Sequence, residues 1–429
     1  MEAPRRKPLL IRGARQVGKT WLAKEFGRRH FRNVVYVNFD LDANPAGDRR
    51  IHAVFEQDIR PDRLVRALEA LFDTSIEPGE TLIILDEVQE QTRAMAALKY
   101  FAEDAPGYHV VAAGSHLGVA MRPGTGLPVG KVDVLSLFPL TFTEFLAALR
   151  RDRLAEAVAG GEWDLLAVLH GELTGLLREY LCVGGMPEVV QGYAENGSLV
   201  EARATQDALL QLLRADFSKH APASQLARVW QVWDSIPVHL AKENQRLVWG
   251  AVRPGARARD LELAFQWLID YGVVYKLPRL TRPGLPLAAY VEDAAFKAFG
   301  LDVGLLGAMA KLDVATLMLG EAAFTEFRGT LAEQFVHQHL VAALGADGPL
   351  AYWTGKAAEV DFVAQLGGMV VPLEVKSATQ VRSKSLRSYL DRYHPAQAFR
   401  LSLAPHEVQT GFTNVPLYAV ETIPREAAA

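Results

Sequence analysis

The sequence predicts an α/β protein built on a parallel sheet with helices on both faces. Between Pro8 and Phe145, apolar runs of three to six residues alternate with longer stretches of helical periodicity. Runs such as Leu82–Leu85 and Val110–Ala113 are typical of strands that are buried on both sides. Alternation of such strands with helices gives a parallel sheet.

The length and composition predict several globular domains. The chain has 429 residues, and a single core rarely grows beyond about 250–300 residues, so two to four domains are expected. Hydrophobic residues make up 50% and charged residues 22%, which argues against a disordered chain. The net charge of −4 indicates no particular class of partner.

Cysteine content and hydropathy favour a cytoplasmic protein without a membrane segment. Cys182 is the single cysteine, so an intramolecular disulfide and a cysteine-rich zinc site are excluded. The longest stretch without acidic or basic side chains, Ala105–Met121, is too polar and too rich in glycine to span a bilayer. The basic start, Met1–Lys7, leads into a strand-like run and not into the apolar segment of a secretory signal.

An eight-residue phosphate-binding pattern (Walker A) follows the apolar run Leu9–Ile11 and precedes a helical stretch. It consists of Gly13, Ala14, Arg15, Gln16, Val17, Gly18, Lys19 and Thr20. The glycines allow backbone amides to point at phosphates, Lys19 can reach the β- and γ-phosphates, and the Thr20 hydroxyl can coordinate Mg²⁺. The sequence therefore predicts a P-loop NTPase core with ATP and Mg²⁺ as cofactors.

Two further strand ends complete the predicted site. The apolar run Thr81–Leu85 ends in Asp86 and Glu87, a Walker B arrangement in which Asp86 would hold Mg²⁺ and Glu87 would polarise the attacking water. The run Val110–Ala113 ends near Ser115, whose hydroxyl could sense the γ-phosphate; the alternative is an ordinary turn serine.

The remainder of the chain divides by pattern into three segments after a core of residues 1–145. Residues 146–215 are predicted to be a helical lid, and residues 216–309 a winged-helix-like module with strands at Tyr271–Leu277 and Leu287–Val291. Residues 310–429 contain a long helix and two strands joined at Gly367-Gly368, which is a strong hairpin signal.

Several motifs along the chain resemble those of one family, the AAA-type ATPases of bacteria and archaea that carry a C-terminal domain of unknown function with a nuclease-like fold. The motifs are Gly13–Thr20, Leu85–Gln89, Ala113–Ser115, Phe138–Phe145, Gly184–Glu188, Asp302–Leu306 and Glu374–Lys376. The resemblance implies an AAA-type core that binds ATP and hydrolyses it slowly. It implies no particular substrate.

The chain departs from this family at two places. Only twelve residues precede Gly13, whereas relatives have about twenty before the phosphate-loop strand, where they help to hold adenine. Gly130-Lys131 stands where many relatives have Gly-Arg, and lysine lacks the planar fork of an arginine finger that would act between copies in a homo-oligomer.

The C-terminal segment contains the order of acids found in the PD-(D/E)XK nuclease-like fold. Glu333 lies in the long helix, Asp361 in one predicted strand, and Glu374 and Lys376 in the next. Strand alternation places Glu374 and Lys376 on one face, where the hairpin can bring Asp361 beside them. These carboxylates could bind a second Mg²⁺ while Lys376 activates water, or they could be the remnant of an inactive site.

Nucleic acid is the partner that the charge pattern favours, through the winged-helix-like module. Eight basic residues against four acids lie between Lys242 and Arg282, whereas the segment from Ala310 onward has no basic excess. The alternative is a helix face that is exposed to solvent, which could contain the same excess of basic residues without binding nucleic acid. Three hypotheses follow: an ATP-driven conformational switch, an ATP-gated metal-dependent nuclease, and a DNA-binding regulator with structural acidic sites.

Overall fold

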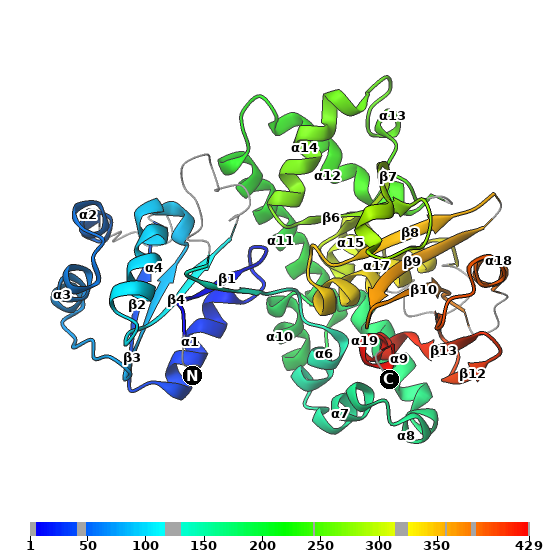
Figure 1. Ribbon diagram of the computed structural model, residues 1–429, viewed down its shortest axis with the longest axis horizontal. Helices are drawn as coiled ribbons and strands as arrows, with labels where there is room; N and C mark the ends of the chain where they lie inside the picture. Colours follow the sequence, from blue (N-terminus) through cyan, green and yellow to red (C-terminus); the bar gives the residue numbers. More distant parts are fainter. Residues whose placement is uncertain are drawn as a thin grey trace. The chain divides into compact units, whose positions relative to one another are not determined.

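The protein separates into two compact units (Figure 1). The computed structural model describes residues 6–40, 49–115, 130–242, 245–313, 325–356, 358–378 and 383–427. The first unit comprises Met1–Phe138 together with Asp270–Gly272, and the second comprises Pro139–Ile269 together with Val273–Ala429. Among the described helices, none is both long enough and apolar enough to cross a bilayer.

The first unit is a parallel five-stranded sheet with the strand order β2-β3-β4-β1-β5. This confirms the predicted α/β fold class with a parallel sheet. The strands are β1 (Leu9–Arg12), β2 (Asn33–Asn38), β3 (Thr81–Asp86), β4 (His109–Gly114) and β5 (Asp133–Ser136). The helices are α1 (Lys19–His30), α2 (Arg49–Gln57), α3 (Pro61–Phe72) and α4 (Thr92–Asp104), with a short 3-10 turn, η1 (Val88–Glu90).

Alternation along the strands of the first unit produces two separate apolar layers. Ile83 and Leu85 of β3 pack with residues of α2, α3 and α4. Leu82 and Ile84, one position out of phase, pack with Ala23 of α1. Because both faces are covered, the strands read as continuous apolar runs, which is the pattern that the sequence displayed.

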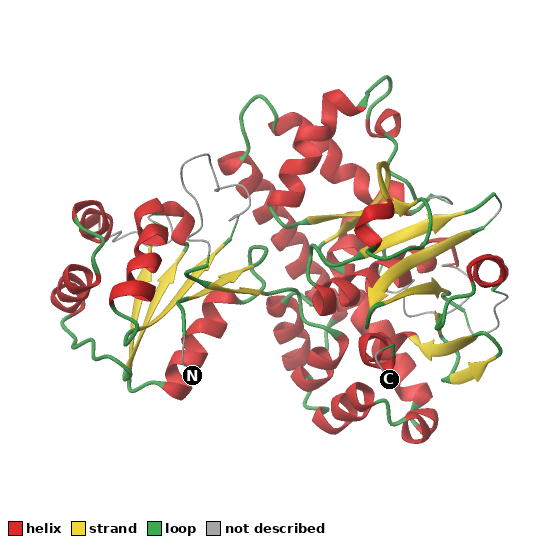
Figure 2. Cartoon of the chain, in the orientation of Figure 1, coloured by secondary structure: helices red, strands yellow, loops and turns green. Residues whose placement is uncertain are grey.

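The second unit begins with helices that occupy most of residues 142–270 (red in Figure 2). They are α6 (Phe142–Ala148), α7 (Asp152–Gly160), α8 (Trp163–Val168), α9 (His170–Val183), α10 (Pro187–Asn196), α11 (Leu199–His220), α12 (Leu226–Leu240), α13 (Trp249–Val252) and α14 (Ala258–Asp270). The helical character predicted for residues 146–215 is therefore confirmed. Its role as a lid stays a prediction.

A mixed eight-stranded sheet, with the order β12-β13-β11-β10-β9-β8-β6-β7, forms the rest of the second unit (yellow in Figure 2). Its strands are β6 (Val274–Leu280), β7 (Val291–Gly300), β8 (Leu350–Thr354), β9 (Glu359–Leu366), β10 (Met369–Val375), β11 (Phe399–Ser402), β12 (Glu407–Gln409) and β13 (Phe412–Pro416). The accompanying helices are α15 (Val303–Met309), α17 (Thr325–Leu344), α18 (Lys384–Tyr393) and α19 (Ile423–Glu426), with 3-10 turns η2 (Leu287–Tyr290) and η3 (Leu417–Thr422).

Two local predictions in this sheet have different outcomes. The hairpin at Gly367-Gly368 is confirmed, because β9 and β10 pair antiparallel around it and both glycines have positive φ angles. The strand predicted at Leu287–Val291 is wrong except for its last residue. A 3-10 turn after Pro286 buries the Leu287 side chain instead, and β7 starts at Val291.

The eight-stranded sheet contains strands from two segments that were predicted to be separate modules. β6 and β7 come from the predicted winged-helix-like module, and β6 pairs in parallel with β8 of the predicted C-terminal segment. The winged-helix and nuclease-like assignments stay predictions, as does the division of the chain into four segments.

One buried carboxylate joins several of the motifs that the sequence singled out. Asp302, which is 1% exposed, accepts hydrogen bonds from the backbone N–H of Gly185 (2.6 Å) and of Leu305 (2.9 Å). A Cβ atom on Gly184 would lie 2.2 Å from Asp302 Oδ1, and one on Gly185 would lie 2.1 Å from the Leu140 carbonyl oxygen. These glycines are required because larger residues would push the three segments apart.

Candidate active site

The phosphate loop connects β1 to α1 and leaves the first turn of α1 open. Gly18 is the N-cap residue of α1, with a φ of 93°, and it offers no side chain to cap the helix. The first turn contains no acidic residue. The uncapped N–H groups and the positive end of the helix dipole therefore favour an anion at this position.

Gly13 lies close to Leu137, the residue that follows the end of β5. A Cβ atom at this position would lie 2.3 Å from the Leu137 carbonyl oxygen, so a larger residue would displace the backbone. Leu137 itself donates its N–H to the Arg12 carbonyl oxygen at 2.7 Å. The first glycine of the motif is thus required by the contact between β1 and the segment after β5.

Lys19 is folded into the loop and almost fully buried. Its ammonium donates to the carbonyl oxygens of Gly13 (3.1 Å) and Ala14 (2.7 Å), and the residue is 5% exposed. Burial lowers the pKa of Lys19 to about 8, although the nearby charges of Glu87 and Asp86 oppose the shift. The loop therefore contains a buried cation whose nearest hydrogen-bond partners are neutral.

Asp86 ends β3 next to α1 and binds three donors. Its Oδ2 accepts from the Thr20 hydroxyl (2.7 Å) and from the Tyr36 phenol (2.8 Å), and its Oδ1 accepts from the Glu87 backbone N–H (3.0 Å). The structure thus brings together Thr20 and Asp86, which are 66 positions apart and which the sequence predicted to hold one Mg²⁺.

Glu87 follows immediately in an uncommon backbone conformation. Its φ of 51° lies in the left-handed region, which non-glycine residues adopt mainly in turns and at functional sites. Gln89 donates its side-chain amide to Glu87 Oε2 at 2.5 Å. This hydrogen bond restrains one of the two carboxylate oxygens of Glu87.

Ser115 lies just beyond the end of β4, the strand between β1 and β3. The residue is 1% exposed, and its hydroxyl has no hydrogen-bond partner within the described part of the chain. An unpaired buried hydroxyl is costly and usually indicates a missing ligand or water. Ser115 therefore follows a strand that lies between β1, which leads into the phosphate loop, and β3, which ends in Asp86. Its role as a sensor of the γ-phosphate stays a prediction.

The C-terminal acids form a second charged region in the other unit. Lys376 lies 3.3 Å from Glu374 Oε1, and Asp361 Oδ2 accepts the backbone N–H of Val375 at 2.7 Å. Burial raises the pKa of Glu374, and the Lys376 ammonium opposes that shift. The structure therefore brings Asp361 of β9 close to the end of β10, where Glu374 and Lys376 lie.

Glu333 has a different partner, one that the sequence did not indicate. The ammonium of Lys297, on β7, lies 3.3 Å from Glu333 Oε2 and 2.7 Å from Glu359 Oε1, and Lys297 is 1% exposed. Gln245 bridges the pair by donating to Glu333 at 2.8 Å and accepting from Lys297 at 3.1 Å. Burial raises the pKa of Glu333 to about 7, with Lys297 opposing the shift.

This second region does not fit a metal ion as arranged. Lys297 already supplies a positive charge between Glu333 and Glu359, where a divalent cation would bring the same kind of charge. Across the described ranges, no three His, Cys, Asp or Glu side chains gather so that they could hold a metal.

The comparisons with known proteins identify the first unit. Residues 5–146 match the family described as AAA domain (AAA_14). The first unit is an AAA-type P-loop ATPase domain. Two families described as domains of unknown function match the rest of the chain, DUF8612 over residues 174–316 and DUF4143 over residues 328–420. No curated protein matches the chain.

Solved structures share low overall similarity with the chain. The Walker-type ATPase PABY2304 of Pyrococcus abyssi is 15% identical, with coverage of 71% of this chain and 91% of that chain, at a TM-score of 0.43. The ORC1 protein of Aeropyrum pernix, solved in complex with DNA, is 16% identical, with coverage of 73% and 88%, at a TM-score of 0.29. Similarity at this level indicates nothing about a substrate or partner.

The residues of the AAA domain fit the ATP and Mg²⁺ that its family implies. The loop offers an uncapped helix N-terminus and a buried ammonium to phosphate oxygens. The Thr20 hydroxyl and the Asp86 carboxylate provide the hard oxygen ligands that Mg²⁺ prefers. The Ser115 hydroxyl, which has no hydrogen-bond partner among the described residues, could supply a further donor.

Lys131, considered above as a substitute for an arginine finger, makes an ion pair within the AAA domain. Its ammonium lies 2.7 Å from Glu103 Oε1 on α4, and its side chain is 43% exposed. Lys131 would have to leave Glu103 before it could reach a nucleotide in another copy of the chain.

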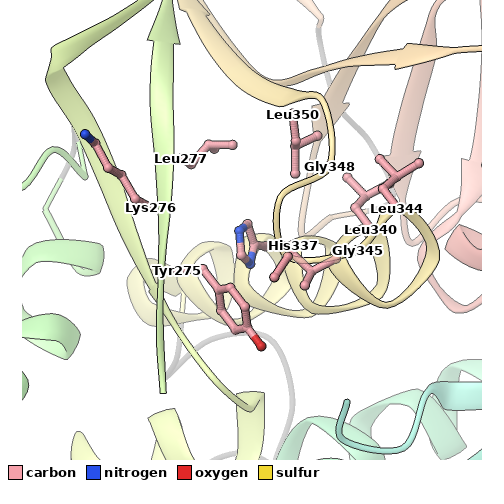
Figure 3. Close-up of a pocket in the computed structure, with 11 residues that line it drawn as sticks. Tyr275, Lys276, Leu277, His337, Leu340, Leu344, Gly345, Gly348 and Leu350 are labelled. Atoms are coloured by element: carbon pink, nitrogen blue, oxygen red, sulfur yellow. The ribbon is translucent and has the colours of Figure 1, made fainter. Parts of the chain in front are cut away.

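A small cavity in the second unit is excluded as a nucleotide site by its size. It lies between β6 and the C-terminal half of α17, where His337 projects from the helix beside Tyr275 (Figure 3). Its volume of about 20 Å³ accommodates about one water molecule. His337 Nδ1 has no partner among the described residues, and one water there would satisfy it.

Sequence reasoning missed Tyr36 and Lys297. An aromatic residue in a strand gives no signal, so the hydrogen bond from Tyr36 to Asp86 could not be anticipated. Lys297 did offer a signal, since it is the single charged residue in the apolar run Ala294–Gly300. A lysine inside a buried strand requires acidic partners, and these could have been sought among the C-terminal acids.

Proposed function

We propose that this protein binds ATP with Mg²⁺ in its AAA domain and hydrolyses it to drive a conformational switch. The observation that carries the proposal is the 2.7 Å contact between Thr20 and Asp86, beside an uncapped phosphate loop. This contact brings together the Walker A and Walker B residues that hold Mg²⁺ in P-loop enzymes.

Each residue has a defined task in this proposal. The amides from Gly13 to Gly18 and the Lys19 ammonium bind the phosphates, and Thr20 and Asp86 hold Mg²⁺, which neutralises charge on the phosphate oxygens. Glu87 Oε1 orients water and accepts its proton, while Gln89 holds Oε2. Ser115 donates to the γ-phosphate, which gives its buried hydroxyl a partner.

The test is nucleotide binding and steady-state ATP hydrolysis on three proteins. Lys19→Ala is expected to lose nucleotide binding, because a neutral loop lacks the ammonium that contacts the phosphates. Glu87→Gln is expected to bind ATP like the wild type but to lose turnover. Unchanged hydrolysis in either pure variant would contradict the proposal.

Nucleic acid is the partner we propose for the switch, through the segment Lys242–Arg282. Four of its eight basic residues make ion pairs with acids: Arg246 with Glu359, Arg259 with Asp260, Lys276 with Asp293 and Arg279 with Glu292. The free positive charge is thus smaller than the sequence count indicates. Stimulation of ATP hydrolysis by DNA would support this partner. DNA binding with the same affinity in the presence and absence of ATP would instead favour a DNA-binding regulator.

Metal-dependent cleavage of nucleic acid is a second candidate, favoured by the grouping of Asp361 and Glu374 on neighbouring strands with Lys376, which follows β10 directly. The Lys297 ammonium argues against it, since it already neutralises Glu333. Asp361→Ala should abolish cleavage without changing ATP hydrolysis if this candidate is correct. Wild-type protein that cuts no duplex, single-stranded or branched substrate with Mg²⁺ or Mn²⁺ would exclude it.

A further inference from the structure

Tyr36 makes a direct hydrogen bond to the acid of the proposed magnesium site. Its phenol donates to Asp86 Oδ2 at 2.8 Å, and the same oxygen accepts the Thr20 hydroxyl at 2.7 Å. β2 and β3 are adjacent parallel strands in which Tyr36 pairs with Ile84. Tyr36, Ile84 and Asp86 therefore lie on one face of the sheet, the face covered by α1.

The tyrosine ring is held in place by α1. The ammonium of Lys24, one helical turn after Thr20, lies 3.5 Å from the ring centroid. This distance is well within the range of a cation–π interaction, which restrains the ring.

A carboxylate with one hydrogen-bonded oxygen is restricted in its rotation. Among the described residues, Thr20 is the other donor to Asp86 Oδ2, and the Thr20 hydroxyl is itself a proposed metal ligand. If the Thr20 hydroxyl bound Mg²⁺ through its oxygen, its orientation would depend on the metal, whereas Tyr36 would donate to Oδ2 independently of the metal. Outer donors of this kind typically change metal affinity by about 10- to 100-fold.

We propose that Tyr36 is a positioning residue for Asp86, which sets how tightly the AAA domain binds Mg²⁺ in the presence of ATP. The proposal rests on the function proposed above and adds a residue to its metal site. It requires Tyr36 to act through its hydroxyl and not through its ring.

The experiment compares wild type with Tyr36→Phe, which removes the hydroxyl and keeps the ring under Lys24. Binding of N-methylanthraniloyl-ATP is measured by fluorescence in EDTA and across a Mg²⁺ titration. We expect equal binding in EDTA, and a Mg²⁺ midpoint raised by about 10- to 100-fold in the variant. Turnover at saturating Mg²⁺ should be preserved, since Tyr36 touches neither water nor phosphate in this proposal.

Two controls separate this role from a structural one. Tyr108→Phe removes a phenol hydroxyl elsewhere in the AAA domain and should leave the Mg²⁺ midpoint unchanged. Lys24→Met keeps the hydroxyl of Tyr36 and removes the cation over its ring, so its midpoint should shift less than that of Tyr36→Phe.

The outcomes distinguish the inference from the function on which it rests. A wild-type Mg²⁺ midpoint in Tyr36→Phe would overturn the role of Tyr36 and leave the ATPase proposal intact. Loss of nucleotide binding by that variant in EDTA would also overturn it, because the residue would then support the fold. Failure of the wild-type protein to bind the nucleotide at all would overturn both.

Discussion

Lys19 and Lys297 are both almost fully buried, and their surroundings differ in a way that separates the two charged regions of this protein. Lys19 donates to two neutral carbonyl oxygens in the phosphate loop, and burial lowers its pKa to about 8. Burial also disfavours the charged form of Lys297, but the carboxylates Glu333, Asp361 and Glu359 outweigh it and raise its pKa.

The contrast indicates what each region is built to hold. A buried ammonium whose hydrogen-bond partners are neutral carbonyl oxygens can still pair with an anionic ligand such as a polyphosphate. A buried ammonium that contacts two carboxylates is already neutralised, so it holds strands and helices together without a ligand. The buried ammonium of Lys19 thus favours an anionic ligand, whereas the ammonium of Lys297 is paired with carboxylates of its own unit.

The largest expected effect is on stability in Lys297→Met. This variant leaves Glu333 and Glu359, which are 13% and 27% exposed, without their cation. The loss should lower the free energy of unfolding of the second unit by about 3–5 kcal/mol. Chemical denaturation followed by tryptophan fluorescence measures it. The signal reports the second unit, because Trp21 is the only one of the seven tryptophans in the first unit.

Two variants control for this result. Lys276→Met removes an exposed ion pair on the neighbouring strand and should cost at most about 1 kcal/mol. Glu333→Gln added to Lys297→Met should recover part of the loss, since it removes an uncompensated charge. If Lys297→Met were as stable as the wild type, the ion pairs of Lys297 would not stabilise the second unit. The contrast drawn between Lys19 and Lys297 would then be wrong.

An intermediate effect is expected on turnover in Ser115→Ala. The hydroxyl is unpaired among the described residues, so its removal should leave the nucleotide-free protein equally stable or slightly more stable. Loss of a hydrogen bond to a charged phosphate should reduce ATP turnover about 10-fold or more. Steady-state kinetics test the expected loss of turnover, and thermal denaturation tests the expected stability. Ser75→Ala, at an exposed serine, is the control. Undiminished turnover would identify Ser115 as an ordinary turn residue.

The smallest expected effect is the pH dependence that follows from Lys19. At pH 9, with a pKa of about 8, about a tenth of the free protein retains the Lys19 proton, so ATP affinity should fall about tenfold between pH 7 and 9. Isothermal titration calorimetry measures this change. Lys19→Arg, which stays charged, should bind with an affinity that is flat over this range.

The same shift has a consequence for stability with a defined sign. The unfolded chain has a Lys19 pKa near 10.5, above the folded value of about 8, so the unfolded state binds more protons between these two values. The contribution of Lys19 to stability should therefore rise with pH through this window. A wild-type curve that matches that of Lys19→Arg would show that burial does not shift this lysine.

The sequence by itself determined the parts that depend on neighbouring residues. The phosphate loop is contiguous from Gly13 to Thr20, and its fold follows from glycine positions and a flanking strand and helix. Apolar runs without alternation determined a parallel sheet covered on both faces, because each such strand must be buried on two sides. Asp86 and Glu87 could be assigned because they end one of those strands.

The tertiary structure alone decided which distant groups meet. Tyr36 reaches Asp86 because β2 lies next to β3 in register, and strand order is not encoded in any local pattern. Lys297 and Glu333 meet across a sheet and a helix from segments that the sequence divided between two modules. Long-range pairing depends on the packing of the whole chain, so the sequence located the acids but could not show which cation neutralises them.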